Sequence, residues 1–146
     1  VNESMPSYAI GKLKSHLDND LAGKKIAVLG LAFKKGTSDV RKSPGVKIAN
    51  LLDKFGAHVT AYDPQANEEA REDLRRSVTL CDTLADTVAA CDAVVIATDW
   101  QEFTELSSDL LSDQLTPGAV LLDAVNAYTR RQELTAHGLR YSGIGR

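Results

Sequence analysis

Apolar runs alternate with amphipathic stretches from one end of the chain to the other. Runs rich in aliphatic and β-branched residues predict strands at 26–30, 58–63, 78–82, 93–99 and 117–123. The stretches around them predict helices at 4–22, 44–55, 65–77, 83–92, 103–115 and 129–138. This alternation predicts an α/β fold: a Rossmann-like doubly wound parallel sheet with helices on both faces, preceded by an N-terminal helix that Ser4 would cap.

Length and composition indicate one globular domain. The chain has 146 residues, of which 43% are apolar and 25% charged, and its net charge of −3 argues against a dedicated nucleic-acid binder. It contains no run of about 18 apolar residues and no targeting pattern, so we expect no membrane partner and a cytoplasmic protein. Because the chain starts at Val1, already within a helix, we interpret it as part of a longer protein. Residues 1–22 would be the end of a leading helix and 23–146 the domain itself.

The cysteines and histidines indicate neither catalysis nor metal binding. Cys81 and Cys91 lack the Cys-x-x-Cys spacing of zinc and redox motifs, and reduced thiols are favoured over a disulfide. His16, His58 and His137 are scattered, with no second ligand at metal spacing. Since no nucleophile with a base and no paired carboxylates can be identified, we assign no catalytic residue and no metal.

Parallel sheets bind ligands outside the carboxyl ends of their strands. Four residues follow predicted strands directly: Gly30, Asp63, Asp99 and Asp123. The dinucleotide fingerprint Gly-x-Gly-x-x-Gly is incomplete, because Ala32 and Lys35 stand at its second and third glycines. Asp63 could bind a ribose or form a turn with Pro64, and the turn is favoured. Trp100 could stack on a base or pack in the protein, and packing is favoured.

A long basic loop, GLAFKKGTSDVRKS at residues 30–43, joins the first predicted strand to the next helix. Such junctions usually take about two to six residues. Four cations gather there at a helix N-terminus, where an anion such as phosphate would be stabilised: Lys34, Lys35, Arg41 and Lys42. Residue types leave a second interpretation equally open, a solvated loop in which Asp39 pairs with Arg41.

Several segments, in the same order, resemble one known family. They are VNESMPSYAIGKLKSHL, GKKIAVLGLAFKKGTSDVRKSPGVKIANLL, GAHVTAYDPQA, CDAVVIATDWQEF and YSGIGR. Together they resemble the C-terminal, UDP-binding domain of the UDP-glucose/GDP-mannose dehydrogenase family, and the pattern G-x-A-F-K-x-x-T-x-D-x-R-x-S-P is the most specific part of the match. The resemblance implies an NAD-dependent UDP-sugar 6-dehydrogenase of the UDP-glucose to UDP-glucuronate type, which oxidises a primary alcohol to a carboxylate in two steps.

The resemblance also implies roles for the loop and partners for the domain. Phe33 and Lys34 would contact the UDP-sugar, and Arg41 would reach NAD held mainly by an N-terminal domain. Three residues would keep the loop's shape by local hydrogen bonds and helix capping: Thr37, Asp39 and Ser43. The expected partners are the UDP-sugar, the protein's own N-terminal domain and further copies in a homo-oligomer. Because the family's catalytic cysteine and lysine lie earlier in the chain, we expect this domain to be inactive alone.

Two positions depart from the family's pattern. Val125 stands where the family usually has a substrate-contacting arginine, and Lys42 where it usually has a glutamate. Either a neighbour replaces the arginine, or the sugar is not glucose, or affinity is reduced; the neighbours are Asn126, Arg130 and Arg131. The departures keep an alternative open, a non-catalytic nucleotide-binding regulatory or interaction module. A Gly-x-Gly-x-x-Gly domain upstream of Val1 would favour the enzyme.

Overall fold

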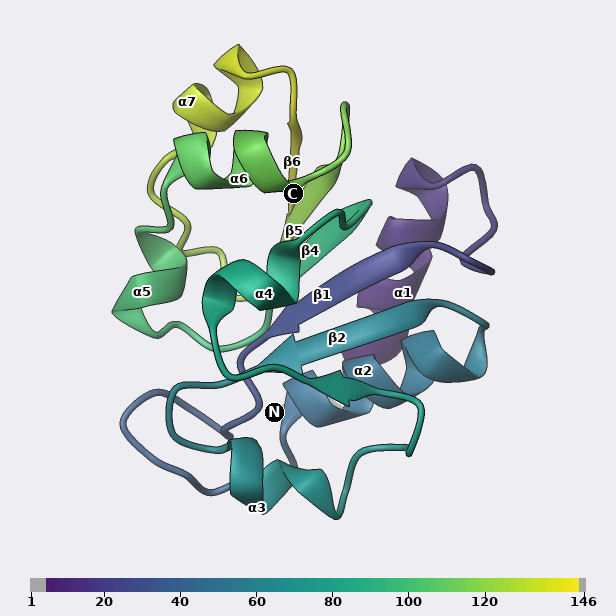
Figure 1. Ribbon diagram of the computed structural model, residues 1–146, viewed down its shortest axis with the longest axis vertical. Coiled ribbons are helices and arrows are strands. Elements are labelled where there is room, and N and C mark those ends of the chain that lie inside the picture. Colours follow the sequence, from purple (N-terminus) through teal and green to yellow (C-terminus); the bar gives the residue numbers. More distant parts are fainter. Residues whose placement is uncertain (1–4, 145–146) are drawn as a thin grey trace.

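The strands form one parallel sheet. The computed structural model describes residues 5–144, with β1 (Lys25–Leu29), β2 (His58–Tyr62), β3 (Thr79–Leu80), β4 (Ala93–Ile96), β5 (Val120–Asp123) and β6 (Arg140–Gly143). Their order is β3-β2-β1-β4-β5-β6, and every neighbouring pair is parallel (Figure 1). The order reverses between β1 and β4, as in a doubly wound Rossmann-like sheet. The predicted fold class is therefore confirmed.

Helices cover both faces of this sheet. One face carries α1 (Met5–His16), α2 (Pro44–Lys54) and α3 (Asn67–Arg71), and the other carries α4 (Leu84–Val88), α5 (Gln101–Thr104), α6 (Ser108–Gln114) and α7 (Arg131–Ala136). Successive strand side chains point to opposite faces, so Ile26 joins the core under α1 and α2 whereas Ala27 joins the core on the other face. No helix within residues 5–144 has the length and apolar character needed to span a bilayer.

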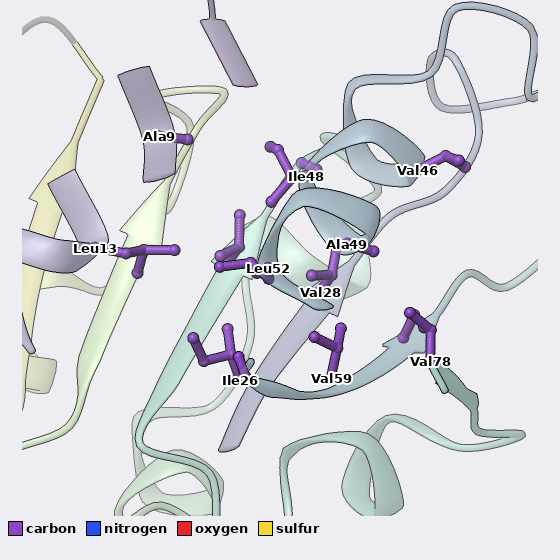
Figure 2. Close-up of a cluster of buried hydrophobic side chains, with 14 of the residues drawn as sticks. Ala9, Leu13, Ile26, Val28, Val46, Ile48, Ala49, Leu52, Val59 and Val78 are labelled. Carbon is purple, nitrogen blue, oxygen red and sulfur yellow. The ribbon is translucent and has the colours of Figure 1, made fainter. Parts of the chain in front are cut away.

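Helix α2 begins where the long loop ends. Ile48 and Leu52 are fully buried and lie in the same core as Val28 of β1 (Figure 2). Burying a side chain of this size contributes about 1.5–3 kcal/mol. The Ser43 side chain accepts a hydrogen bond from the Val46 N–H at 3.2 Å and so caps the first turn. The cap and the buried face together fix where the loop returns to the sheet.

Helix α1 is shorter than predicted. It ends at His16 because Asp18 and Asn19 adopt left-handed backbone angles, each with φ of 60°. The Asn19 N–H donates to the Lys14 carbonyl at 2.7 Å. This bond reaches back five residues, as the wider of the two hydrogen-bonded turns in a Schellman motif does. Ser4, the expected cap of this helix, lies outside the described residues.

The helix predicted at 65–77 is confined to α3 by a contact from α2. The Asn50 side chain donates to the Asp73 carbonyl at 2.9 Å and accepts from the Arg75 N–H at 2.8 Å. These bonds hold the backbone after α3 as a turn against α2. A charged, weakly apolar segment has little burial to resist such a contact, so the prediction was too long.

The helix predicted at 103–115 is two helices, α5 and α6. The Thr104 carbonyl, which a continuous helix would use internally, accepts from both the N–H and the hydroxyl of Thr129, at 2.8 and 2.9 Å. The Ser107 side chain then caps α6 by accepting from the Leu110 N–H at 3.2 Å. A long-range contact and a local cap together break the helix.

Strand β6 was not predicted. It pairs with β5 over four positions, from Val120 opposite Arg140 to Asp123 opposite Gly143. Its sequence, RYSG, lacks the apolar β-branched run of the inner strands, because an edge strand has one neighbour and is covered less completely.

Two glycines bring the ends of the long loop together. A Cβ on Gly45 would overlap the carbonyl oxygen of Gly30. Gly30 itself has φ of 108°, and a Cβ there would lie 2.5 Å from Thr98 Oγ1. The chain thus leaves and rejoins the sheet at one point, as in an Ω-loop. Figure 1 shows the loop extending beyond the carboxyl ends of β1 and β2, which is the ligand edge of the sheet.

We expect opposite effects from adding a methyl group at two glycines. Gly45→Ala should lower the free energy of unfolding by about 3 kcal/mol, because the new methyl meets backbone rather than a movable side chain. Gly11→Ala in α1 should raise it by about 1 kcal/mol, since a Cβ at Gly11 meets nothing within 4 Å. Urea unfolding midpoints measure both changes, and equal midpoints for the two variants would contradict this account of the loop.

Candidate ligand site at the carboxyl edge of the sheet

One buried carboxylate holds the start of the long loop in place. Asp63, directly after β2, is 2% exposed. Its Oδ2 accepts hydrogen bonds from the backbone N–H groups of Leu31 and Ala32, at 2.8 and 2.9 Å, and from Trp100 Nε1 at 3.1 Å. Its Oδ1 accepts two more from the backbone of the turn that follows, at 2.8 and 2.9 Å. Asp63 thereby joins the connections that follow β1, β2 and β4.

These bonds decide between the two interpretations of Asp63. Five N–H donors occupy a carboxylate that has about four lone-pair sites, so none is left for ribose hydroxyls. The turn interpretation is confirmed. Trp100 is half-buried, gives its indole N–H to Asp63 and packs against the core on the α4 to α7 face. Its observed role is packing.

Thr98 adds a further bond that the sequence analysis missed. Its hydroxyl donates to the Ala32 carbonyl at 3.1 Å, and the side chain is 2% exposed. A polar residue at the end of an apolar strand only weakly indicates such a bond in the sequence, because the bonding partner lies 66 residues away in the chain. Asp63 and Thr98 together fix both polar groups of the Ala32 backbone.

Short-range hydrogen bonds shape the rest of the loop. The Phe33 N–H donates to the Asp39 carbonyl at 2.6 Å and closes the turn between them. Within that turn the Thr37 hydroxyl oxygen accepts from the Asp39 N–H at 3.1 Å. Ser43 is 2% exposed and caps α2 as described above. The loop therefore has internal structure at Thr37, Asp39 and Ser43, while Lys34 lies exposed on the turn.

Asp39 and Arg41 form a bidentate ion pair on the loop surface. Arg41 Nε lies 3.0 Å from Asp39 Oδ1, and Arg41 Nη2 lies 2.8 Å from Oδ2. Hydrogen bonds from the Arg41 side chain, followed by one from its backbone N–H, lower the pKa of Asp39 to about 2. The Arg41 side chain is 88% exposed, so solvent screens the pair and leaves the guanidinium accessible.

The loop brings some of the predicted site residues together on one surface. Phe33, Asp39, Arg41 and Lys42 line an open depression of about 310 Å³. Phe33 is 38% exposed, which is unusual for a large apolar side chain. Lys34 follows Phe33 but does not line the depression. With four cations and one carboxylate, residues 30–43 carry a net charge of +3 in a chain whose total is −3. This surface suits an anion that also has an apolar or aromatic part.

The three neighbours considered as substitutes for an arginine at position 125 already have partners within the chain. Asn126 donates to and accepts from the backbone of Ile144, at 3.0 and 3.1 Å. Arg130 donates to a backbone carbonyl after α5 at 3.1 Å, and the Arg131 guanidinium lies 5.2 Å from the centre of a tyrosine ring. Val125 is half-buried against the core on the α4 to α7 face. Position 125 thus presents an apolar side chain at the edge.

We expect loss of the Asp63 carboxylate to be far more costly than loss of one of its donors. Asp63→Asn places an amide group where N–H donors converge and should lower the free energy of unfolding by about 3 kcal/mol. Trp100→Phe keeps an aromatic ring and removes one donor, so about 1 kcal/mol is expected. Urea unfolding of both variants checks the difference. Equal losses would show that Asp63 does not hold the loop.

The Asp39 carboxyl should titrate with a midpoint near pH 2. Its folded-state pKa lies below the ordinary value of 3.8, so the ion pair's contribution to loop order is complete above about pH 4 and is lost as pH falls through about 2. Carbon-13 NMR of the carboxyl group gives the midpoint directly. In Arg41→Ala the midpoint should rise toward about 3.9. An unchanged midpoint in that variant would rule out Arg41 as the cause.

Comparison with known proteins identifies the family. Residues 27–130 match the UDP binding domain of the UDP-glucose/GDP-mannose dehydrogenase family. A UDP-glucose 6-dehydrogenase of Rhizobium meliloti (strain 1021) is 40% identical across 100% of this chain, and the chain covers 33% of that protein. The UDP-glucose 6-dehydrogenase TuaD of Bacillus subtilis (strain 168) is 36% identical, with 100% of this chain and 31% of that protein covered. The chain thus spans about a third of the length of these relatives.

Solved structures agree with the sequence match. A UDP-glucose dehydrogenase from the hyperthermophilic archaeon Pyrobaculum islandicum superposes with a TM-score of 0.78 and 36% identity, over 98% of this chain and 30% of that one. An NDP-N-acetyl-D-galactosaminuronic acid dehydrogenase from Methanosarcina mazei Go1 gives a TM-score of 0.83 and 27% identity, over 99% and 30%. The family match covers the loop, the sheet switch point and most of the strands described above. The chain therefore belongs to the UDP-glucose/GDP-mannose dehydrogenase family, of which it forms the UDP binding domain.

Proposed function

We propose that this chain is the nucleotide-sugar-binding part of an NAD-dependent UDP-sugar 6-dehydrogenase, which oxidises a primary alcohol to a carboxylate in two steps. The UDP-glucose 6-dehydrogenases among its relatives support the reaction class. The observation that carries the proposal is the surface of the long loop, where Phe33 and Lys34 lie exposed on a segment of net charge +3. A nucleotide sugar offers a diphosphate to the cations and flat or apolar ring surfaces to the phenyl group.

The loop residues divide between the two proposed ligands. Phe33 and Lys34 contact the UDP-sugar, and Arg41 reaches the diphosphate of NAD across the cleft to another domain. Arginine suits that role because it has five N–H donors, and those that Asp39 does not occupy stay accessible to phosphate oxygens. Thr37, Asp39 and Ser43 keep the loop in shape through the hydrogen bonds described above. Asp39 also orients the guanidinium of Arg41.

This chain's own switch point does not fit a dinucleotide of the usual Rossmann type. The turn after β1 has only the first glycine of the fingerprint, and the space beside Gly30 is filled by Thr98. The carboxylate of Asp63 is fully engaged by N–H donors and cannot take a ribose. NAD is therefore assigned mainly to a preceding N-terminal domain. The chain's contribution is to bind and orient the sugar nucleotide.

The chain does not itself supply the nucleophile that such a two-step oxidation uses. Burial raises the pKa of both Cys81 and Cys91, and Cys91 is fully buried. A reactive cysteine would instead be partly exposed with a lowered pKa. The isolated domain should therefore bind without catalysing. The complete enzyme is proposed to be a cytoplasmic homo-oligomer in which an N-terminal domain supplies NAD and the reacting groups.

The alternative is a nucleotide-binding regulatory or interaction module that carries out no chemistry. The apolar Val125 at the edge of the site favours it, because turnover would not then require an arginine there. Both functions predict binding of uridine nucleotides. They differ in whether the complete polypeptide reduces NAD in the presence of a UDP-sugar, which a rise in absorbance of NADH would report.

Calorimetric titration tests the proposed site. We expect this 146-residue chain to bind UDP, UDP-glucose or UDP-N-acetylglucosamine more tightly than NAD, and Lys34→Ala to weaken the uridine ligands about tenfold through loss of a charge-assisted contact. Lys54→Ala, which removes an exposed lysine at the far end of α2, is the matched control. Uridine affinity that is equal in the two variants would remove Lys34 from the site. Absence of uridine binding both here and in the complete polypeptide would overturn the proposal.

A further inference from the structure

The outer face of α1 and α2 has an apolar groove that nothing within the described residues covers. Ile10 and Gly11 of α1 and Leu51 and Phe55 at the end of α2 line it, together with Ser7 and Lys14, and it encloses about 240 Å³. This is smaller than the roughly 300–1,000 Å³ of small-molecule sites, so the groove is the size for a few side chains. It lies near the C-terminal end of α2, away from the loop of the ligand edge.

An exposed aromatic side chain lines this groove. Among the residues that the structure describes, three large hydrophobic side chains are exposed; Phe55, at 45%, lines the groove, and Tyr8, at 46%, lies elsewhere on the surface of α1. The third is Phe33 of the ligand loop. The Lys14 Nζ lies 4.1 Å from the centre of the Phe55 ring and holds that ring against α1. An exposed aromatic ring at an apolar groove is typical of a protein-binding surface.

Gly11 points to close approach by another backbone. It lies in the middle of α1, where glycine costs about 1 kcal/mol relative to alanine. No contact within the described part of the chain requires it, since a Cβ there would meet nothing within 4 Å. Because glycine has no side chain, the floor of the groove at this position is formed by backbone alone. That feature allows a helix to lie close against α1, as small residues do at helix contacts.

The charge around the groove defines the occupant. Helix α1 has no carboxylate and carries Lys12 and Lys14, of which Lys14 lines the groove, while α2 carries Lys47 and Lys54. The single carboxylate of α2, Asp53, has a side chain only 7% exposed and is bonded to Arg75 and Ser77. A second copy of this face would place lysines against lysines. A helix with an apolar ridge flanked by Asp or Glu is complementary instead.

We propose that this groove is the docking surface for an acidic amphipathic helix from the remaining two-thirds of the same polypeptide. The inference rests on the proposed function in one respect, that the chain is part of a longer dehydrogenase. The helix sets its apolar residues at i, i+3 and i+4 into the groove beside Gly11, and its carboxylates face Lys14 and its neighbours. Docking on this face leaves the loop of the ligand edge free to face the other ligand-binding domain.

Thiol labelling of the complete polypeptide tests the proposal. Ser7→Cys places a thiol in the groove, and Gln132→Cys on α7 is the matched exposed control, both in a Cys81→Ser background. Mass spectrometry of the peptide that holds each introduced cysteine gives its rate separately from that of any cysteine elsewhere in the polypeptide. We expect Ser7→Cys to react with a maleimide at least about tenfold more slowly in the complete polypeptide than in this 146-residue chain, because the docked helix must open first. The control should react equally fast in both.

Each labelling result either supports or overturns the proposed docking of the helix. Slow labelling that does not change on dilution supports the proposal, and slow labelling that is lost on dilution would assign the groove to a second copy and overturn it. Equal rates in the two proteins would also overturn it. Lys14→Glu should restore fast labelling at Ser7→Cys by repelling the acidic helix while leaving uridine binding unchanged, and unaltered protection would refute the acidic occupant.

Failure of this inference and failure of the proposed function remain distinguishable. Lys34→Ala should weaken uridine binding and leave the labelling rate at Ser7→Cys unaltered, which is the reverse of the effect of Lys14→Glu. The mass of the purified complete polypeptide is measured first. A mass no greater than that of the 146-residue chain would overturn both proposals at once.

Discussion

The carboxylate of Asp63 is the interaction on which the ligand edge depends. It is buried, accepts five N–H bonds and joins backbone that follows β1 and β2 to a side chain that follows β4. In a low-dielectric surrounding, hydrogen bonds to an ionised group are roughly twice as strong as neutral ones. Three connections that would otherwise move independently are thereby held at one point. The sheet and this set of hydrogen bonds together position the site.

The long loop is fixed at its two ends and exposed at its apex, residues 34–36, so it can be both ordered and accessible. The close approach of Gly30 and Gly45 and the cap at Ser43 set where the loop begins and ends. The Asp39–Arg41 pair shapes its middle without burying either charge. Phe33 and Arg41 are consequently displayed by backbone that has already lost much of its conformational freedom. A ligand meeting such a surface has less ordering entropy to overcome.

The sequence predicted the parts of the structure that depend on local pattern. The inner strands and α2 follow from apolar periodicity, and the long loop stood out by its length and charge. Long-range contacts account for what was missed: Asn50 limits α3, Thr129 divides 103–115, and β6 is too polar to be recognised as a strand. The same holds at the site. Asp63 was placed at the right edge, but its loop partners lie 31 and 32 residues away in the chain.

The way the loop is anchored separates what the fold requires from what the ligand requires. The sheet needs the two glycines and the groups that bond Asp63, whereas Lys34, Lys35 and Gly36 make no buried contact. Lengthening a loop whose ends are already fixed costs little, about 0.6 kcal/mol for each doubling. Sequence change at the apex can therefore alter what the loop contacts with almost no effect on folding. In evolutionary terms, the domain can diversify its specificity without rebuilding its scaffold.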